Sequence, residues 1–219
     1  MYKHPVFTHT PTDTETLDRI RAALPDFVGE KRLNHIFFVE KEVIALAESV
    51  FLVYNIADRY RNDLRAAALL HDLTKQKPLD EQLALCKKYG IAPGLHPSAA
   101  VLHGPTAAAL SEELFGINRF VGDAIACHTT GKPGMNALDE ILFVADYIEP
   151  SRTHLHCKQT RAHFYDSLAA RGVSAAAEIL DETALMSIDG TLSHLIDTAS
   201  FIDEQTVLTR NDLLARLRA

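Results

Sequence analysis

The strongest constraint on the fold is a long run of apolar residues at helical spacing. Between residues 30 and 53, apolar side chains recur at intervals of three and four residues, which is the period of one helix face. The residues that set this period are Leu33, Ile36, Phe37, Val39, Val43, Ile44, Ala47, Val50 and Phe51. No segment of the sequence shows the alternation that is typical of a half-buried strand. We therefore predict an all-α protein, a helical bundle with short connections.

Single Pro and Gly residues and capping signals bound the other helices. Thr12 with Glu15 has the spacing of a capping box and would open the first helix, whereas Asn62 with Asp63 would cap the third. Besides the helix at 30–53, we expect helices over residues 12–24, 62–71, 78–90, 105–115, 120–128 and 136–148, and two or three more from residue 158 onward.

Length and composition favour one globular domain. The 219 residues contain no low-complexity tract, no fixed-period repeat and no long Gly/Ser linker. We expect a single domain over residues 1–219, with a core at about 17–217 and a flexible tail at 1–13. No run approaches the roughly 18 to 20 apolar residues of a membrane span, and the first residues lack a secretory signal, which predicts a cytoplasmic protein without a membrane partner.

Charge and cysteine content exclude further classes. The chain has 22 Lys and Arg against 29 Asp and Glu, a formal charge of −7. Such a surface repels a nucleic-acid backbone, so we exclude a polymeric nucleic-acid partner. Cys86, Cys127 and Cys157 form no Cys-x-x-Cys pair, which argues against a disulfide framework and a thiolate zinc site. We expect all three to be reduced and mostly buried.

Two segments place acidic or imidazole side chains where burial is expected. His71 and Asp72 end an Ala/Leu-rich helix, and Asp146 directly follows the apolar run of residues 141–145. Burying such groups costs several kcal/mol unless they are hydrogen-bonded or bind a metal ion. Metal binding is the simplest explanation for both segments.

Further histidines extend this set. His35 lies in the long helix, and His128 ends another helix. Pro105 fits the first turn of a helix, which would place His103 at a helix N-terminus. The candidate ligands are His35, His71, Asp72, His103, His128 and Asp146. Without a thiolate, this set suits iron or manganese, with zinc, cobalt and magnesium as alternatives, and it is large enough for two ions if a carboxylate bridges them.

Several short blocks resemble a known family. They are Lys31-Arg32-x-x-His35, Ala68-Leu69-Leu70-His71-Asp72-x-x-Lys75, Leu102-His103-Gly104-Pro105, His128-Thr129-Thr130-Gly131-Lys132-Pro133-Gly134-Met135, Ala145-Asp146-Tyr147-Ile148-Glu149-Pro150-x-Arg152 and Thr206-x-x-x-Arg210-Asn211-x-Leu213-Leu214. In order, they are similar to the blocks of the YqeK-type symmetrical diadenosine tetraphosphatases, which are HD-domain metal-dependent phosphohydrolases. The resemblance extends from about residue 17 to residue 217.

The resemblance implies an HD-domain helical bundle with an iron-type dinuclear site. The implied reaction is hydrolysis of a dinucleoside polyphosphate through its middle, which converts diadenosine tetraphosphate into two ADP. In this scheme Asp72 bridges the two ions, and Lys75 and Arg152 stabilise charge on the phosphates. The implied substrate contacts are Asn34, Lys75, Thr130, Gly131, Lys132, Arg152, Thr206 and Arg210.

Two departures from the family pattern affect these expectations. Lys132 stands where the family more often has Arg, which replaces a forked phosphate donor with a point charge. The segment of residues 153–157 does not match the family, and we expect its two histidines, His154 and His156, to be solvated. Tyr147 and Glu149 are expected to hydrogen-bond the segment that carries Asp146.

Other functions stay open at this stage. Within the hydrolases, the alternative is an HD-fold nucleotide phosphomonoesterase. A dinuclear-iron oxygenase has the same kind of ligand set, and a metal-containing regulator would bind nucleotides without turnover. Lys75, Lys132 and Arg152 suit several phosphates better than a small polyol, which favours the hydrolase. The sequence leaves a homodimer open.

Overall fold

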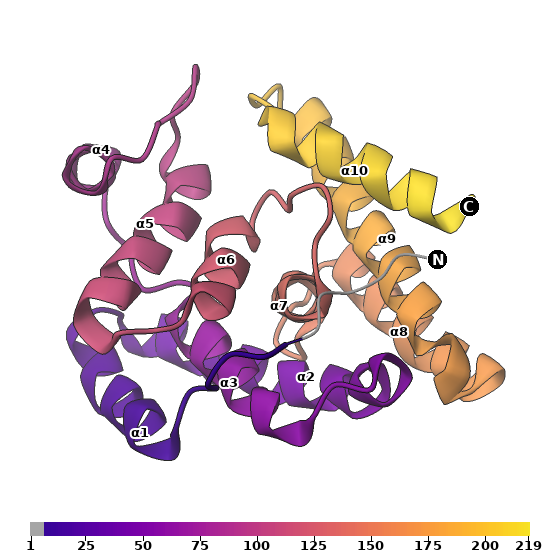
Figure 1. Cartoon of the computed structure of the whole chain (residues 1–219). Helices are drawn as coiled ribbons and strands as arrows, with labels where there is room; N and C mark the ends of the chain where they lie inside the picture. Colours follow the sequence, from indigo (N-terminus) through magenta and orange to yellow (C-terminus); the bar gives the residue numbers. More distant parts are fainter. Residues whose placement is uncertain (1–6) are drawn as a thin grey trace.

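The computed structural model describes residues 7–219, which form ten α-helices and three short 3₁₀ turns (Figure 1). The helices are α1 (Thr14–Ala23), α2 (Glu30–Tyr54), α3 (Arg61–Leu70), α4 (Leu79–Tyr89), α5 (Ala99–Phe115), α6 (Arg119–Cys127), α7 (Ala137–Ile148), α8 (Leu155–Arg171), α9 (Ala176–Asp197) and α10 (Glu204–Leu217). The 3₁₀ turns cover Leu24–Asp26, Asp58–Tyr60 and Val173–Ala175. No strand occurs among the described residues, which confirms the predicted all-α class. None of the described helices could span a membrane.

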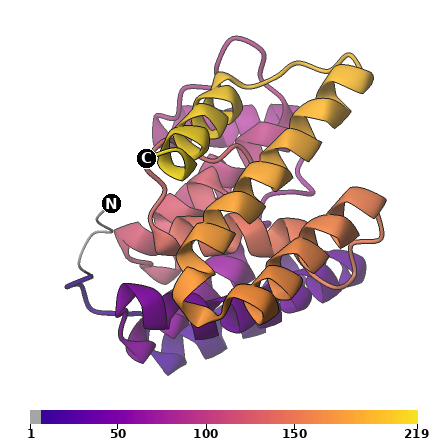
Figure 2. The ribbon, with the colours of Figure 1, turned by 90° about the vertical axis from the view of Figure 1, so that its right-hand side faces the viewer.

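Helix α7 forms the centre of the molecule. It packs against α2, α3, α6, α8 and α9, and Figure 1 shows it end-on between the lower layer of α1–α3 and the group of α8–α10. Figure 2 shows α9 running diagonally across the outer face with α10 at its upper end. Ile141, Leu142 and Val144 of α7 are fully buried. A polar residue on this helix is therefore surrounded by protein.

The start of α7 is held by a capping box. The Asn136 side chain accepts hydrogen bonds from the backbone N–H groups of Leu138 (2.8 Å) and Asp139 (3.3 Å). In return, the Asp139 carboxylate accepts the Asn136 N–H at 3.0 Å. These bonds satisfy N–H groups that have no partner within the helix. The helix expected at residues 136–148 is thereby confirmed, and α2 also matches its prediction.

The two caps predicted from the sequence are wrong. Asp13, not Thr12, caps α1 by accepting the Thr16 N–H at 2.7 Å. Helix α3 begins at Arg61 after a 3₁₀ turn, and Asp63 lies within it, fully buried. Thr12 donates to Asp63 from both its N–H and its hydroxyl, each at 2.8 Å. Both residues therefore serve a long-range contact and not a local cap.

This contact anchors the chain before α1. The side chain of Asp63 also accepts hydrogen bonds from His9 (2.7 Å) and Asn118 (2.9 Å). Phe7 is buried and packs against Tyr60 and Phe120, with ring centroids 5.4 and 5.2 Å apart. We expected a flexible tail at residues 1–13. Residues 1–6 lie outside the described residues, whereas Phe7, His9 and Thr12 contact the body of the protein.

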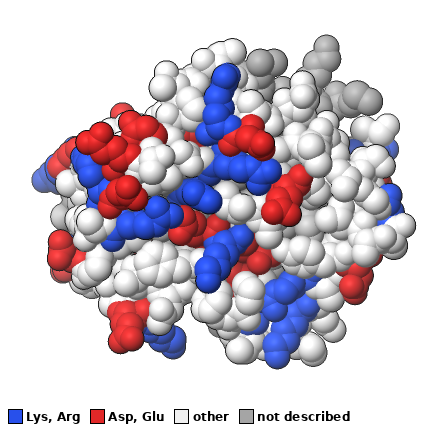
Figure 3. All heavy atoms as spheres, turned by 90° about the horizontal axis from the view of Figure 1, so that it is seen from below, with Lys and Arg blue, Asp and Glu red and all other residues white. Residues whose placement is uncertain are grey.

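The face below the lower helices carries charges of both signs. Figure 3 shows Lys and Arg side chains interleaved with Asp and Glu on this face. They form no continuous basic surface there, in keeping with the formal charge of −7. A nucleic-acid backbone would meet repulsion as well as attraction on this face.

We predict that Asp63→Ala lowers the free energy of unfolding by about 2 to 4 kcal/mol, because it removes a buried carboxylate and strands its donors. The measurement is urea denaturation followed by circular dichroism. The matched control is Asp58→Ala, because the Asp58 carboxylate is 84% exposed and, within residues 7–219, pairs only with Arg61. Its effect should stay within about 0.5 kcal/mol. Equal effects of the two substitutions would contradict the anchoring role of Asp63.

Candidate metal centre

The structure brings all six candidate ligands into one cluster. His35 lies in α2, His103 in α5 and Asp146 in α7, whereas His71 with Asp72 and His128 follow the last residues of α3 and α6. Their ligating atoms form three overlapping groups, within each of which all atoms lie within 4.8 Å of one another. The groups are His35 with His71 and Asp72, His71 with His128 and Asp146, and Asp72 with His103 and His128.

Asp72 lies between two pairs of imidazoles. Its Oδ1 atom is 3.3 Å from Nε2 of His103 and 3.9 Å from Nε2 of His128. Its Oδ2 atom is 3.4 Å from Nε2 of His71 and 3.6 Å from Nε2 of His35. Each carboxylate oxygen thus faces a different pair of imidazoles.

Hydrogen bonds on the far side of the rings orient three of these histidines. In His71 and His128, Nδ1 lies 2.6 and 2.7 Å from the backbone carbonyl three residues earlier. Because a carbonyl can only accept, Nδ1 carries the proton and Nε2 presents a lone pair to the cluster. The Nδ1 atom of His35 bonds to the buried carboxylate of Glu149 at 3.1 Å. Such outer bonds are usual for metal-binding histidines.

The cluster leaves buried nitrogen atoms without hydrogen-bond partners. Nε2 of His71 is buried and accepts no hydrogen bond, whereas Nε2 of His35 has the Asp146 carboxylate 3.0 Å away. Nε2 of His103 and Nε2 of His128 face each other at 3.0 Å. Unsatisfied buried polar atoms are costly, and a cation between converging lone pairs removes this cost. The donor set therefore fits divalent metal ions.

Electrostatics favour the protonation states that metal binding needs. Burial opposes the charge of Asp72 and Asp146, but neighbouring imidazoles and, for Asp146, the Arg152 guanidinium hold the pKa of each carboxyl well below its usual range. Burial lowers the pKa of His103, and burial with the nearby imidazoles lowers the pKa of His128 to about 3. The carboxylates are thus ionised and these two imidazoles neutral, as ligands must be.

His35 differs from the other histidines. Burial disfavours its charge, but hydrogen bonds to Asp146 and Glu149 outweigh burial and raise the pKa of His35 to about 9. Its Nε2 atom lies 3.0 Å from Oδ1 of Asp146. A proton on Nε2 of His35 therefore meets the negative charge of Asp146.

A close approach of two helices sets the distance between His103 and His128. A Cβ atom at Gly104 would lie 2.9 Å from the backbone oxygen of Ala126 in α6, which is too close for any side chain. We expected His103 at a helix N-terminus, but α5 begins at Ala99 and includes Pro105 in its interior. His103 is therefore held inside a continuous helix that packs closely against α6.

Three cationic side chains border the cluster. Arg32 donates to Oδ2 of Asp72 at 2.7 Å, and Arg152 donates to Oδ1 of Asp146 at 2.5 Å. Nζ of Lys75 lies 3.3 Å from Nε2 of His103. From the sequence, Lys75 and Arg152 were expected to stabilise charge on the phosphates. Arg32 belongs to the first sequence block, but we assigned it no role there. Its position three residues before His35 was the only sequence signal for a place beside the cluster.

The loop after α6 meets the cluster through Thr129. Its hydroxyl lies 3.2 Å from Nε2 of His103 and 3.3 Å from Nε2 of His128. The Thr130 hydroxyl instead donates to the Gly131 carbonyl at 3.0 Å. From the sequence we assigned Thr130 and Gly131 to the substrate and overlooked Thr129, whose only signal was its position beside a histidine.

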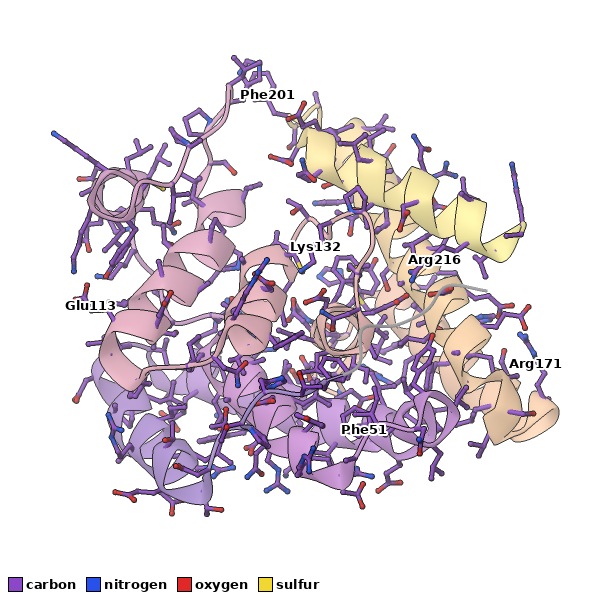
Figure 4. All side chains as sticks on the ribbon, in the orientation of Figure 1. Phe51, Glu113, Lys132, Arg171, Phe201 and Arg216 are labelled. Carbon is purple, nitrogen blue, oxygen red and sulfur yellow. The ribbon has the colours of Figure 1, made fainter. Side chains whose placement is uncertain are left out.

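The structure does not bring three of the predicted substrate contacts into the cluster. Lys132, labelled in Figure 4, pairs with the fully buried carboxylate of Asp139 at 2.9 Å and lines a separate pocket of about 430 Å³. Arg210 pairs with Asp189. Thr206 is buried in α10. The charge of Lys132 compensates a buried carboxylate, which spacing along the sequence does not reveal.

The predictions for residues that follow α7 are confirmed only in part. His154 is exposed, as expected, whereas His156 is partly buried with its Nδ1 atom 3.0 Å from the Tyr147 hydroxyl. Glu149 holds His35 and also accepts bonds from the Ser151 N–H and hydroxyl, each at 2.6 Å. The cluster contains no cysteine. The three cysteines are free and buried, as predicted.

Comparison with known proteins identifies the family. A family model described as the HD domain matches residues 28–151, more than half of the chain and the stretch that contains all six candidate ligands. The chain belongs to the HD-domain family. The predicted resemblance to HD-domain phosphohydrolases is thereby confirmed.

Individual proteins that are similar to this HD-domain protein carry related names. A symmetrical bis(5'-nucleosyl)-tetraphosphatase of Staphylococcus aureus is 34% identical over 63% of this chain and 68% of the relative. A protein of the same name from Halalkalibacterium halodurans is 31% identical over 84% of this chain and 90% of the relative. A crystal structure from Clostridium acetobutylicum, named "predicted HD superfamily hydrolase involved in NAD metabolism", is 32% identical, covers 91% of this chain and 97% of its own, and gives a TM-score of 0.77.

We predict that Gly104→Ala reduces the bound metal and lowers activity about tenfold or more, because the new methyl group must push α5 away from α6 and separate His103 from His128. Metal content and hydrolysis rate are measured on the same preparation. The matched control is Gly122→Ala in α6, where a Cβ atom would meet only a side-chain carbon at 3.9 Å. The control should keep metal and activity. A Gly104→Ala protein that also keeps its metal and its activity would refute the packing argument.

Proposed function

We propose that this HD-domain protein is a metal-dependent hydrolase that cleaves dinucleoside polyphosphates symmetrically, converting diadenosine tetraphosphate into two ADP. The observation that carries the proposal is the position of Asp72, whose two oxygens face separate pairs of imidazoles. The names of the relatives from Staphylococcus aureus and Halalkalibacterium halodurans support the choice of substrate and cleavage position.

The proposed cofactor is a pair of divalent cations held by the six-residue cluster, with Asp72 as the bridge. We propose iron as the metal, because imidazole and carboxylate ligands without thiolate suit it; manganese, cobalt, zinc and magnesium are the alternatives. When bound, two such cations activate water at neutral pH and neutralise charge on the attacked phosphate. Outer bonds from Glu149 and backbone carbonyls orient the ligands.

The chain's own cations bind and polarise the polyphosphate in this proposal. Arg32 and Arg152 each use part of the guanidinium on a carboxylate of the cluster, which leaves further N–H donors for phosphate oxygens. Lys75, beside His103, stabilises charge on the leaving diphosphate. Asn34 lines a pocket next to His35 and contacts the same substrate. None of these cations serves as the base.

The reaction breaks one bridging P–O bond at the centre of the four-phosphate chain. Water supplies the new oxygen on the attacked phosphorus, the bridging oxygen leaves with the other half, and a proton is released. Each half carries two phosphates, so both products are nucleoside diphosphates. Arg152 and Lys75 meet the negative charge that grows during this step.

The direct test is anaerobic purification with metal analysis, followed by incubation with diadenosine tetraphosphate and chromatography of every product. We expect ADP as the only nucleotide product and about two metal ions per chain. AMP with ATP would show a hydrolase with another cleavage position. Phosphate release from nucleoside monophosphates alone would favour the phosphomonoesterase. Bound iron without nucleotide consumption would favour an oxygenase.

Asp72→Ala tests the bridge. We expect loss of both metal ions and a fall in activity of at least about a hundredfold, with an unchanged helical circular dichroism spectrum, because one carboxylate serves both ions. Asp80→Ala, at an exposed position in the first turn of α4, is the control and should retain metal and activity. A fully active Asp72→Ala protein would eliminate the dinuclear mechanism.

A further inference from the structure

A pocket of about 580 Å³ lies beside the metal cluster, and Phe38 is the one apolar residue among the polar and charged residues that line it. One face of α2 forms a wall of this pocket, with residues spaced by three and four positions, and the connection from α7 to α8 forms another. The pocket is lined by Lys31, Arg32, Asn34, His35, Phe38, Gln76, Glu149, Ser151, Arg152, Thr153 and His154. Its volume is within the range of small-molecule sites.

Phe38 is the apolar member of this lining. Its neighbour Phe37 packs against the hydrophobic core, whereas Phe38 does not belong to the core and is 37% exposed. The ring has a cation near it, with Nζ of Lys41 5.9 Å from its centroid. An aromatic ring that faces a polar pocket gains little from folding and offers a flat surface to a ligand.

The pocket has a charged end and an aromatic end. Arg32 and Arg152 contact the carboxylates of the cluster, so the charged end adjoins the proposed reaction centre. Phe38 follows Arg32 by six residues, which is about 9 Å along the axis of α2. Half of a dinucleoside polyphosphate has the same polarity, with phosphates at one end and a flat base at the other.

We propose that this pocket binds one nucleoside diphosphate half of the substrate and that the base stacks on Phe38. The proposal rests on the proposed function, and it adds a binding residue that neither the sequence blocks nor the family match singles out. Every nucleobase has a π face, so stacking on Phe38 accepts different bases. Because Phe38 does not touch the reacting phosphorus, its contribution is to binding and is equal in the ground state and the transition state.

The test compares ligands with and without a base on the metal-loaded protein. We predict that Phe38→Ala weakens the binding of ADP about tenfold or more, while the binding of inorganic pyrophosphate, which has no base, changes less than about twofold. Isothermal titration calorimetry measures both. In steady-state assays with diadenosine tetraphosphate, Phe38→Ala should raise KM with little change in kcat.

Two controls separate stacking from a general loss of structure. Phe38→Tyr keeps the flat ring and should restore ADP binding to near the wild-type value. Leu52→Ala removes a 71% exposed apolar side chain from the same helix, about 21 Å further along its axis, and should leave both ligands unaffected. Equal losses for ADP and pyrophosphate, or unchanged ADP binding in Phe38→Ala, would overturn the proposal.

The outcomes also distinguish this inference from the proposed function. A wild-type protein that leaves diadenosine tetraphosphate intact but binds ADP through Phe38 would refute the proposed function and support the pocket. A protein that produces ADP with the same KM in wild type and Phe38→Ala would support the function and refute the stacking role. A wild-type protein that binds no ADP would refute the pocket.

Discussion

The carboxylate of Asp72, almost completely buried among imidazoles, is the constraint around which the polar cluster is arranged. Its two oxygens lie between the pair of His71 and His35 and the pair of His103 and His128. A buried charge of this kind is stable only when opposite charge or a cation meets it. Five helices therefore converge on this point and supply the partners.

Helix ends and helix contacts both serve this convergence. His71 and His128 follow the last residues of α3 and α6, and the Nδ1 atom of each ring bonds to a carbonyl group in the last turn of its own helix. This hydrogen bond orients each ligand. Gly104 allows α5 to touch the backbone of α6, which brings the fourth imidazole into reach.

Local patterns predicted much of the architecture because they act within one element. The apolar period predicted α2, and the helix expected at residues 136–148 matches α7. The six-residue cluster was predictable because acidic and imidazole groups in apolar helices need a partner. The caps proposed at Thr12 and Asp63 were wrong, because these residues bind each other across 51 positions.

By itself, the sequence determined an all-α chain, the helix faces that are buried and the six polar residues proposed as metal ligands. Only the tertiary structure decided which oxygen of Asp72 faces which imidazoles, that Arg32 joins the cluster and that Lys132 is paired with Asp139 instead. Spacing along a helix fixes the direction in which a side chain points. The partner of that side chain lies on another helix, and the distance between the two side chains depends on how closely the helices pack.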